Sequence, residues 1–145
     1  TYVDGTDLDQ FPHPVAAHVG DAAVDLQTTH RVVLAPHTTV DAHTGWTVEL
    51  HPLTSGEVLS RSGLSGRGVI VANAPGLVDS GYRGEVKVPL INLDPNTPIE
   101  LSRGDRIAQL VIQRVVHARF TPVDSLEVSA RGERGFGSTG GFAAD

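Results

Sequence analysis

Glycine and proline interrupt this chain every few residues, and that spacing limits its fold more than any other feature. The 145 residues include 16 Gly and 9 Pro, and the apolar stretches between them are short and rich in β-branched side chains. No stretch has the length and the 3.6-residue period of a substantial helix. Many short strands with glycine-rich corners favour an all-β sandwich, jelly roll or barrel.

The apolar stretches predict individual strands. They are Arg31–Leu34, Gly45–Leu50, Gly56–Leu59, Val69–Ala72, Gly84–Leu93, Pro98–Leu101 and Ile107–Val116. Within the fifth, Val86, Val88 and Leu90 alternate with other residues, which places them on one face. Pro89 removes a ladder donor from the same strand, so we expect an edge strand or a local irregularity there. The last stretch is more continuously apolar, and we expect it to be buried on both faces, partly against another subunit.

Composition sets limits on the class of protein. A chain of this length, 39% hydrophobic, fits one domain that buries its own core. The formal net charge of −6 argues against nucleic-acid binding through neutralised phosphates. No cysteine is present to form a thiolate metal site. Neither a long apolar run nor a basic-then-apolar leader is found, so we expect no membrane partner and a cytoplasmic protein.

The segment Arg61-Ser62-Gly63-Leu64-Ser65-Gly66 combines a glycine-bounded turn with an arginine and hydroxyl groups. Backbone N–H groups exposed in such a turn, next to a guanidinium, suit the oxygens of a phosphate. An ordinary surface loop is the competing interpretation, because Arg-Ser-Gly also occurs where nothing binds.

The segment Asn73–Glu85 resembles a hairpin whose turns are set by glycines, and it places Asp79 and Tyr82 close together. A carboxylate in an irregular loop can orient or deprotonate a water molecule, and a tyrosine can offer a flat face to a sugar or base. Taken alone, Asp79 could equally be a turn-forming residue and Tyr82 a packing residue.

The chain divides into a β domain, residues 1–130, and a glycine-rich tail, residues 131–145. The tail begins Arg-Gly-Glu-Arg-Gly-Phe-Gly-Ser-Thr-Gly-Gly, which is too rich in glycine to order itself without a partner. Its first phenylalanine, Phe136, either docks on another surface or belongs to a frayed end.

Five segments, in this order, resemble the five sequence motifs of the trimeric dUTPase family, and together they span residues 21–141. They are Asp21–Leu26, Ser60–Ser65, Asn73–Glu85, Arg103–Leu110 and Arg131–Gly140. The match departs from the family pattern in two segments. Ala23-Val24 stands where the family usually has Gly-Tyr, and Ser60 and Ser65 stand where it usually has proline and alanine.

The resemblance implies a fold and a reaction. The fold would be a distorted jelly roll, or β-clip barrel, assembled as a homotrimer with C-terminal arms exchanged between subunits. The reaction would be Mg²⁺-assisted hydrolysis of dUTP to dUMP and pyrophosphate, which removes dUTP from the nucleotide pool and supplies dUMP for thymidylate synthesis. Each active site would lie between subunits.

The resemblance also implies a role for each matching residue. Asp79 would activate the water that attacks the α-phosphorus, and Tyr82 would lie against the deoxyribose and exclude a 2′-hydroxyl. Asn73 and its neighbours, including Gly76, would pair with uracil, and Asp25 would support the site. The expected phosphate-binding residues of the body are Arg61, Ser62, Gly63 and Gln109. In the tail, the expected substrate contacts are Arg131 at the γ-phosphate, Phe136 on uracil, and Gly137, Ser138 and Thr139. Mg²⁺ would bind phosphate oxygens and water, with no direct protein ligand.

Two other classes of function compete with this interpretation. The related dCTP deaminases share the fold, but their chemistry needs a carboxylate where this chain has Pro89, and proline cannot shuttle protons. A non-enzymatic trimer that kept the fold is the other class, although Asp79, Tyr82 and Phe136 are all present. Six of the seven histidines lie within residues 13–51, and their spacings match no zinc-ligand pattern.

Overall fold

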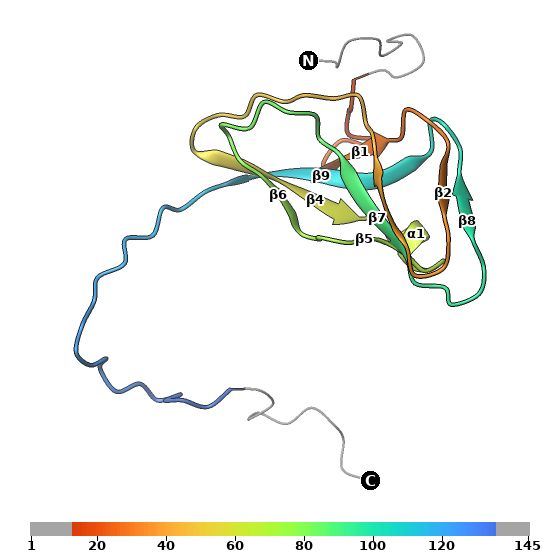
Figure 1. The fold of residues 1–145 in the computed structure, drawn as a ribbon. Coiled ribbons are helices and arrows are strands. Elements are labelled where there is room, and N and C mark those ends of the chain that lie inside the picture. Colours follow the sequence, from red (N-terminus) through yellow and green to blue (C-terminus); the bar gives the residue numbers. More distant parts are fainter. Residues whose placement is uncertain (1–12, 136–145) are drawn as a thin grey trace.

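The structure, a computed structural model, describes residues 13–135, and within them the regular secondary structure consists almost entirely of strands (Figure 1). The elements are β1 (Ala23–Gln27), β2 (Val32–Leu34), β3 (Thr39–Ala42), β4 (Thr54–Ser60), α1 (Ser62–Ser65), β5 (Val69–Val71), β6 (Gly76–Val78), β7 (Val88–Asn92), β8 (Ile99–Leu101) and β9 (Arg106–Arg114). The all-β prediction is therefore confirmed. Within the described residues, no helix is long and apolar enough to span a membrane.

The strands form three antiparallel sheets that wrap around one interior (Figure 1). The largest has the order β1-β9-β4-β6, the second pairs β2 with β8, and the third has the order β3-β7-β5. The first and last strands thus lie side by side, and β9 is a central strand between β1 and β4. This non-sequential pairing is typical of jelly rolls, and it brings distant segments of the chain to one surface.

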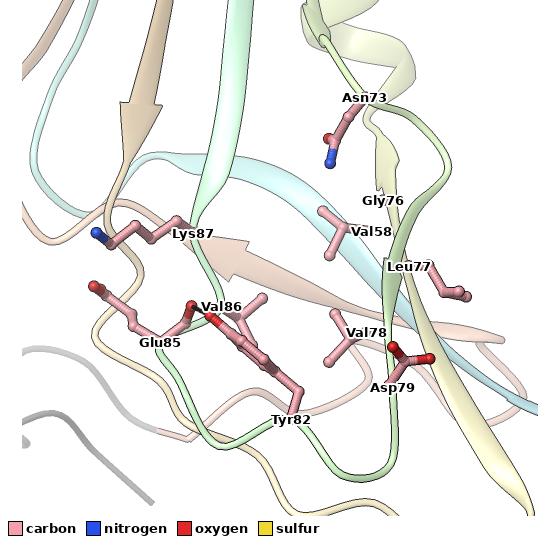
Figure 2. Close-up of a pocket in the computed structure, with 10 residues that line it drawn as sticks. All are labelled: Val58, Asn73, Gly76, Leu77, Val78, Asp79, Tyr82, Glu85, Val86 and Lys87. Carbon is pink, nitrogen blue, oxygen red and sulfur yellow. Dashed lines mark hydrogen bonds between the residues drawn. The ribbon is translucent and has the colours of Figure 1, made fainter.

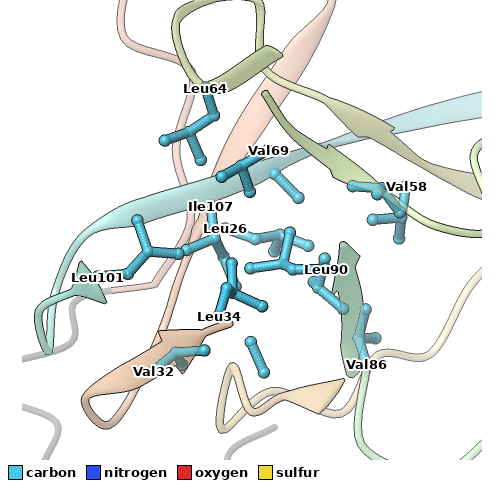
Figure 3. Close-up of a cluster of buried hydrophobic side chains, with 14 of the residues drawn as sticks. Leu26, Val32, Leu34, Val58, Leu64, Val69, Val86, Leu90, Leu101 and Ile107 are labelled. Atoms are coloured by element: carbon cyan, nitrogen blue, oxygen red, sulfur yellow. The ribbon is translucent and has the colours of Figure 1, made fainter. Parts of the chain in front are cut away.

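The core lies between the sheets and consists of branched aliphatic side chains (Figure 3). Leu26, Leu34, Leu90 and Ile107 are among its largest fully buried members. Burying one such side chain contributes about 1.5–3 kcal/mol relative to leaving it in water. The predicted alternation in the fifth stretch is confirmed, because Val86, Val88 and Leu90 all face this core.

Two predicted strands need correction. Gly45–Leu50 is not a strand, since Gly45 adopts φ +73°. The segment meets the loop before β7 only through an isolated bridge between Thr47 and Glu85. Gly84–Leu93 shortens to β7, because its first residues belong to the turn that follows Tyr82. Strands β1, β3 and β6 were not predicted, since each is short and carries polar residues or glycine.

Pro89 lies in a central strand, so an edge position for this strand is wrong. Its carbonyl accepts a hydrogen bond from Ala72 N at 2.7 Å, one residue beyond the end of β5. The nitrogen of Pro89 faces the same side, where the β5 ladder has already ended. A missing donor is tolerated there.

Burial along β9 changes halfway. Ile107, Ala108 and Leu110 are buried, whereas Ile112, Gln113 and Arg114 are exposed. Within one chain the predicted burial is therefore seen in the first half of this stretch, and burial of the second half against another subunit stays a prediction. Beyond β9, residues 115–135 form no strand and run away from the sheets as an extended arm (Figure 1). Val116, Phe120 and Leu126 on this arm are 90%, 91% and 86% exposed.

Candidate active site

A pocket of about 490 Å³ lies beside the end of β6 and holds Asp79 and Tyr82 (Figure 2). Its lining residues are Val58, Asn73, Gly76, Leu77, Val78, Asp79, Tyr82, Glu85, Val86 and Lys87. All but Val58, which comes from β4, belong to one continuous segment. The structure thus brings together four residues that the sequence predicted to act on the base, the sugar and the water. We call this space the Asp79 pocket; its volume falls in the range typical of small-molecule sites.

Local backbone bonds set the positions of Asp79 and Tyr82. Strand β6 ends at Val78, and Tyr82 N then donates to the Asp79 carbonyl at 3.0 Å, which closes a turn. The Tyr82 hydroxyl donates to the Glu85 carbonyl at 2.9 Å, so the ring folds back along the loop (Figure 2). A Cβ at Gly84 would lie 2.4 Å from the Tyr82 hydroxyl oxygen. Only glycine fits there without moving the ring.

Asn73 lies against the first residue of β6. A Cβ at Gly76 would lie 3.2 Å from both the Oδ1 and Nδ2 atoms of Asn73. The absence of a side chain at Gly76 therefore leaves space for the Asn73 amide on the wall of the pocket (Figure 2). An amide offers both a donor and an acceptor, which suits the edge of a nucleobase.

A second pocket, of about 450 Å³, lies at the ends of β1, β4 and β9 around the carboxylate of Asp25. It is lined by Ala17, Asp21, Ala22, Ala23, Asp25, Arg61, Arg106 and Gln109. Sheet register creates it, since Asp25 of β1 and Leu59 of β4 are both paired with Gln109 of β9. The structure therefore gathers three residues predicted to bind or support phosphates. We call this space the Asp25 pocket.

Asp25 joins two arginines in this pocket. Arg61 Nε donates to Asp25 Oδ1 at 2.7 Å, and Arg106 Nη1 donates to Asp25 Oδ2 at 3.3 Å. Arg61 Nη1 also donates to the Arg106 carbonyl at 3.1 Å. The side chains of Asp25 and Arg61 are 18% and 24% exposed, so this pair is only weakly screened by water. The pocket is lined by two arginines and two aspartates, so its suitability for an anion rests on the guanidinium N–H donors and not on a net charge.

The remaining predicted residues lie elsewhere. Ser62 and Gly63 open α1 directly after Arg61 and are exposed. Arg131 lies on the exposed arm, where its Nε donates to the Arg134 carbonyl at 2.9 Å. The predictions for Phe136, Gly137, Ser138 and Thr139 fall outside the described residues. Within residues 13–135, the Asp79 and Asp25 pockets have no lining residue in common.

Two residues at these pockets were not singled out from the sequence. Arg106 contacts Asp25 from 81 residues further along the chain, and only the pairing of β1 with β9 makes them neighbours. Glu85 lines the Asp79 pocket and closes the segment that resembles the third family motif. Its place at the end of that motif is the one sequence signal that could have indicated a role at the site.

Comparison with known proteins decides the family. The sequence model described as dUTPase matches residues 9–140. The chain belongs to the dUTPase family. Deoxyuridine 5′-triphosphate nucleotidohydrolase of Thermobifida fusca (strain YX) is 58% identical to this dUTPase-family chain over 135 residues, which are 92% of this chain and 75% of that protein.

Solved structures of dUTPases have the same fold as this dUTPase-family chain. The dUTPase of Staphylococcus bacteriophage 80alpha with dUpNHpp has a TM-score of 0.82 and 27% identity, and the match covers 90% of this chain and 93% of that one. A mutant dUTPase from phage phi11 of S. aureus, which coordinates a structural Mg(II) ion, has a TM-score of 0.75 and 22% identity, with 83% and 94% covered. The predicted dUTPase fold is confirmed by these matches.

Proposed function

We propose that this protein is a dUTP diphosphatase, which hydrolyses dUTP to dUMP and pyrophosphate. The observation that carries the proposal is the Asp79 pocket, where Asn73, Gly76, Asp79 and Tyr82 line one space of about 490 Å³ in a chain of the dUTPase family. Such a reaction removes dUTP from the nucleotide pool and supplies dUMP for thymidylate synthesis. The cytoplasmic location expected from the sequence stays a prediction.

Asp79 acts on the attacking water in this proposal. Its carboxylate follows β6 on the rim of the pocket, where it can accept a proton from a water aligned with the α-phosphorus (Figure 2). Tyr82, 46% exposed, presents its ring to the sugar and leaves no room for a 2′-hydroxyl. The Asn73 amide and the adjacent backbone pair with uracil, and a base with reversed donors and acceptors would leave buried groups unpaired.

The Asp25 pocket binds the phosphate chain in this proposal. Arg61 and Gln109 face that space, and Ser62 and Gly63 begin the helical turn beside it. Arginine is suited to phosphate because its planar fork donates two parallel hydrogen bonds. Asp25 has a supporting role, since it fixes the orientation of the Arg61 guanidinium.

The active site is completed between subunits of a homotrimer. Separation of the two pockets in one chain supports this, because a nucleotide has to contact nucleoside-binding and phosphate-binding residues together. The exposed apolar side chains of the arm, including Val116 and Phe120, provide a further reason to expect contact with another copy.

Mg²⁺ is the proposed cofactor. Among residues 13–135 no cluster of three or more His, Asp or Glu side chains is arranged to hold a metal ion. The donor set therefore fits an ion bound mainly by triphosphate oxygens and water, as is usual for Mg²⁺. When bound, the ion would offset negative charge on the phosphates, and Arg61 would do the same from the protein.

The C-terminal tail, residues 131–145, acts as a lid in this proposal. Arg131, Phe136, Gly137, Ser138 and Thr139 close over the nucleotide and exclude bulk water. Deleting residues 131–145 should therefore leave a folded trimer whose kcat/KM for dUTP falls by about 100-fold or more, in the range of a lost lid and its contacts. Gel filtration and steady-state kinetics would measure both. A truncated protein as fast as the full chain would remove the lid from the proposal.

A direct assay tests the reaction. The purified full chain is incubated separately with dUTP, dCTP and dTTP in the presence of Mg²⁺, and pyrophosphate and ammonia are followed over time. We expect pyrophosphate from dUTP at a rate well above that from the other two nucleotides. Absence of pyrophosphate from dUTP would overturn the proposal, and release of ammonia from dCTP would favour a deaminase instead.

A further inference from the structure

We propose that His43 and Glu85 form a clamp that positions the Tyr82 ring and thereby contributes to selection of deoxyribose over ribose. The inference rests on the proposed function, in which Tyr82 lies against the sugar. Neither His43 nor Glu85 needs to touch the substrate, so both are positioning residues. The chain of contacts runs from His43 through Glu85 to the hydroxyl of Tyr82.

The side chain of Glu85 is fixed at both oxygens by one segment, residues 43–45. His43 Nδ1 lies 2.7 Å from Glu85 Oε2, and Gly45 N donates to Glu85 Oε1 at 2.9 Å. The Glu85 side chain is only 13% exposed, so these two contacts replace most of its hydration. A carboxylate that accepts two hydrogen bonds in such surroundings has little freedom to change its orientation.

Hydrogen bonds of neighbouring residues hold the loop that carries His43 against the loop that carries Glu85. Thr44 Oγ1 donates to the Val86 carbonyl at 2.7 Å, and Val86 N donates to the Trp46 carbonyl at 2.8 Å. These bonds involve Thr44 and Val86, which are 1% and 3% exposed. The backbones of the two loops are therefore fixed by buried hydrogen bonds. His43→Ala should therefore leave the two loops paired, and its effect should be limited to the local orientation of Glu85.

His43 is in turn held from its other side. Thr29 donates to the His43 carbonyl through its backbone N at 2.9 Å and through its hydroxyl at 3.2 Å. The ring of His30 meets the ring of His43 edge-on, with 5.3 Å between centroids. The imidazole of His43 is thus oriented towards Glu85 by contacts that come from the segment after β1.

Glu85 contacts Tyr82 through its backbone carbonyl. The carbonyl of Glu85 accepts the Tyr82 hydroxyl at 2.9 Å, and the ring passes over Gly84 to reach it (Figure 2). Because Tyr82 is 46% exposed, packing alone does not fix its ring. The hydrogen bond at the tip of the ring therefore helps to set where its face lies. Its acceptor belongs to the residue whose side chain is anchored to residues 43 and 45, and Lys87 N donates to the same carbonyl at 3.0 Å. The proposed link is that release of the Glu85 side chain shifts this carbonyl and, with it, the Tyr82 ring.

The test compares hydrolysis of dUTP and UTP by the full-length protein and its His43→Ala variant. We expect the ratio of kcat/KM for dUTP to kcat/KM for UTP to fall by about fivefold, the factor that corresponds to one ordinary hydrogen bond. A role in folding alone would reduce both values by the same factor and leave the ratio unchanged. An unchanged ratio would therefore overturn the clamp.

Two further variants test whether the change in the dUTP to UTP ratio is specific to His43. His43→Asn keeps an N–H donor close to the place of Nδ1 and should restore most of the ratio. His51→Ala removes an exposed histidine from the turn before β4 and should leave the ratio unchanged. If His51→Ala lowered the ratio as much as His43→Ala, or if His43→Asn gave no recovery, the specific role of His43 would be wrong.

A double-mutant cycle asks whether His43 acts through Tyr82. Tyr82→Phe removes the hydroxyl that contacts Glu85, so His43→Ala added to Tyr82→Phe should lower the dUTP to UTP ratio little further. Additive losses would contradict the proposed connection. Failure of the proposed function is separate from these outcomes, because it would appear as no hydrolysis of dUTP by the unaltered protein.

Discussion

The two pockets of this protein are built in different ways. The Asp79 pocket is made almost entirely by residues 73–87, with Val58 as its one contribution from elsewhere. The Asp25 pocket takes its residues from three strand ends that are distant in sequence, and the register of β1, β9 and β4 brings them together. The residues proposed to contact the nucleoside therefore come from one local segment, whereas the charges proposed to bind phosphate depend on the pairing of the whole sheet.

The difference predicts how each pocket responds to change. A substitution in the Asp79 pocket should alter turnover or selectivity while the fold persists, because its residues are held by short-range turns. A substitution at Asp25 should alter binding and stability together, because its ion pairs also join β1 to the end of β4 and to β9. Replacing Asp79 in one pocket and Asp25 in the other should show this difference in activity and stability most clearly.

The largest expected effect is at Asp79. Asp79→Asn keeps the shape of the side chain and removes its ability to accept a proton, so kcat for dUTP should fall by roughly 1,000-fold, within the range for a lost general base. The Kd of a non-hydrolysable dUTP analogue, measured by calorimetry, should change by less than about threefold because binding contacts remain. Full activity in this variant would show that another group activates the water.

Asp25→Ala should have a mixed effect. It leaves Arg61 and Arg106 facing each other without their shared carboxylate, and removing one partner of a largely buried pair is destabilising. Since Arg106 is 55% exposed and partly screened, we expect a loss of about 2 kcal/mol in the free energy of unfolding. Urea unfolding measures this loss, and KM for dUTP should rise in parallel.

Asp25→Asn serves as the matched control for that variant. It retains the hydrogen-bond acceptor for Arg61 Nε and loses only the charge, so its stability should lie between those of the unaltered protein and Asp25→Ala. If both variants matched the unaltered protein in stability and in KM, the pocket would not depend on this carboxylate, and the contrast between the two pockets would disappear.

Gly84→Ala should affect the Asp79 pocket alone. The added methyl would lie 2.4 Å from the Tyr82 hydroxyl oxygen, so the ring has to move away from the Glu85 carbonyl. We expect KM for dUTP to rise by about tenfold, the cost of a displaced sugar contact. Inhibition by inorganic triphosphate, which needs only the Asp25 pocket, should stay the same. A change in that inhibition would show that the pockets are not independent.

The smallest effect is expected at Asp94, which lies outside both pockets. Backbone N–H groups of Asn96 and Thr97 hold the pKa of this carboxyl below its ordinary value of 3.8. A lowered folded-state pKa stabilises the fold above the ordinary value, and the gain is lost as the pH falls through the folded-state value. Asp94→Ala should therefore lower stability slightly at pH 7, and the difference should narrow below pH 3.8.

Urea unfolding at pH 7 and at pH 3 measures the Asp94 effect, with kcat/KM for dUTP at pH 7 as the control. Activity should be unchanged, since neither pocket includes this residue. A stability difference that widened on acidification would contradict the sign of the pKa shift.

The residues of the Asp79 pocket could be grouped from the sequence because nearly all of them share one segment, while their roles stay predictions. Asn73, Gly76, Asp79 and Tyr82 lie together in the structure, as expected. The ion pair between Arg106 and Asp25 could not be predicted in the same way, since their contact depends on which strands pair. Resemblance to the family identified Arg61 and Gln109, but not the second arginine at the carboxylate.

The incorrect strand predictions have a similar physical cause. Residues 45–50 alternate like a strand, yet Gly45 turns the chain at φ +73°, and the backbone then bonds to residues 85 and 86 instead of forming a ladder. Pro89 indicated an edge strand, whereas it lies in central strand β7 just past the end of β5. Local sequence patterns show the preference of a segment, but the neighbouring segments decide whether a ladder forms.

The central claim is that the Asp79 pocket of one subunit and the Asp25 pocket of a neighbouring subunit together form one active site. Asp79→Asn and Arg61→Ala chains, each with its own affinity tag, are coexpressed and the mixed oligomers are purified through both tags. Each variant alone should be nearly inactive, whereas the doubly purified mixed trimers should recover about a third of normal turnover, because one of the three sites in each mixed trimer then combines an intact Asp79 with an intact Arg61. Mixed trimers as inactive as either parent would contradict the account.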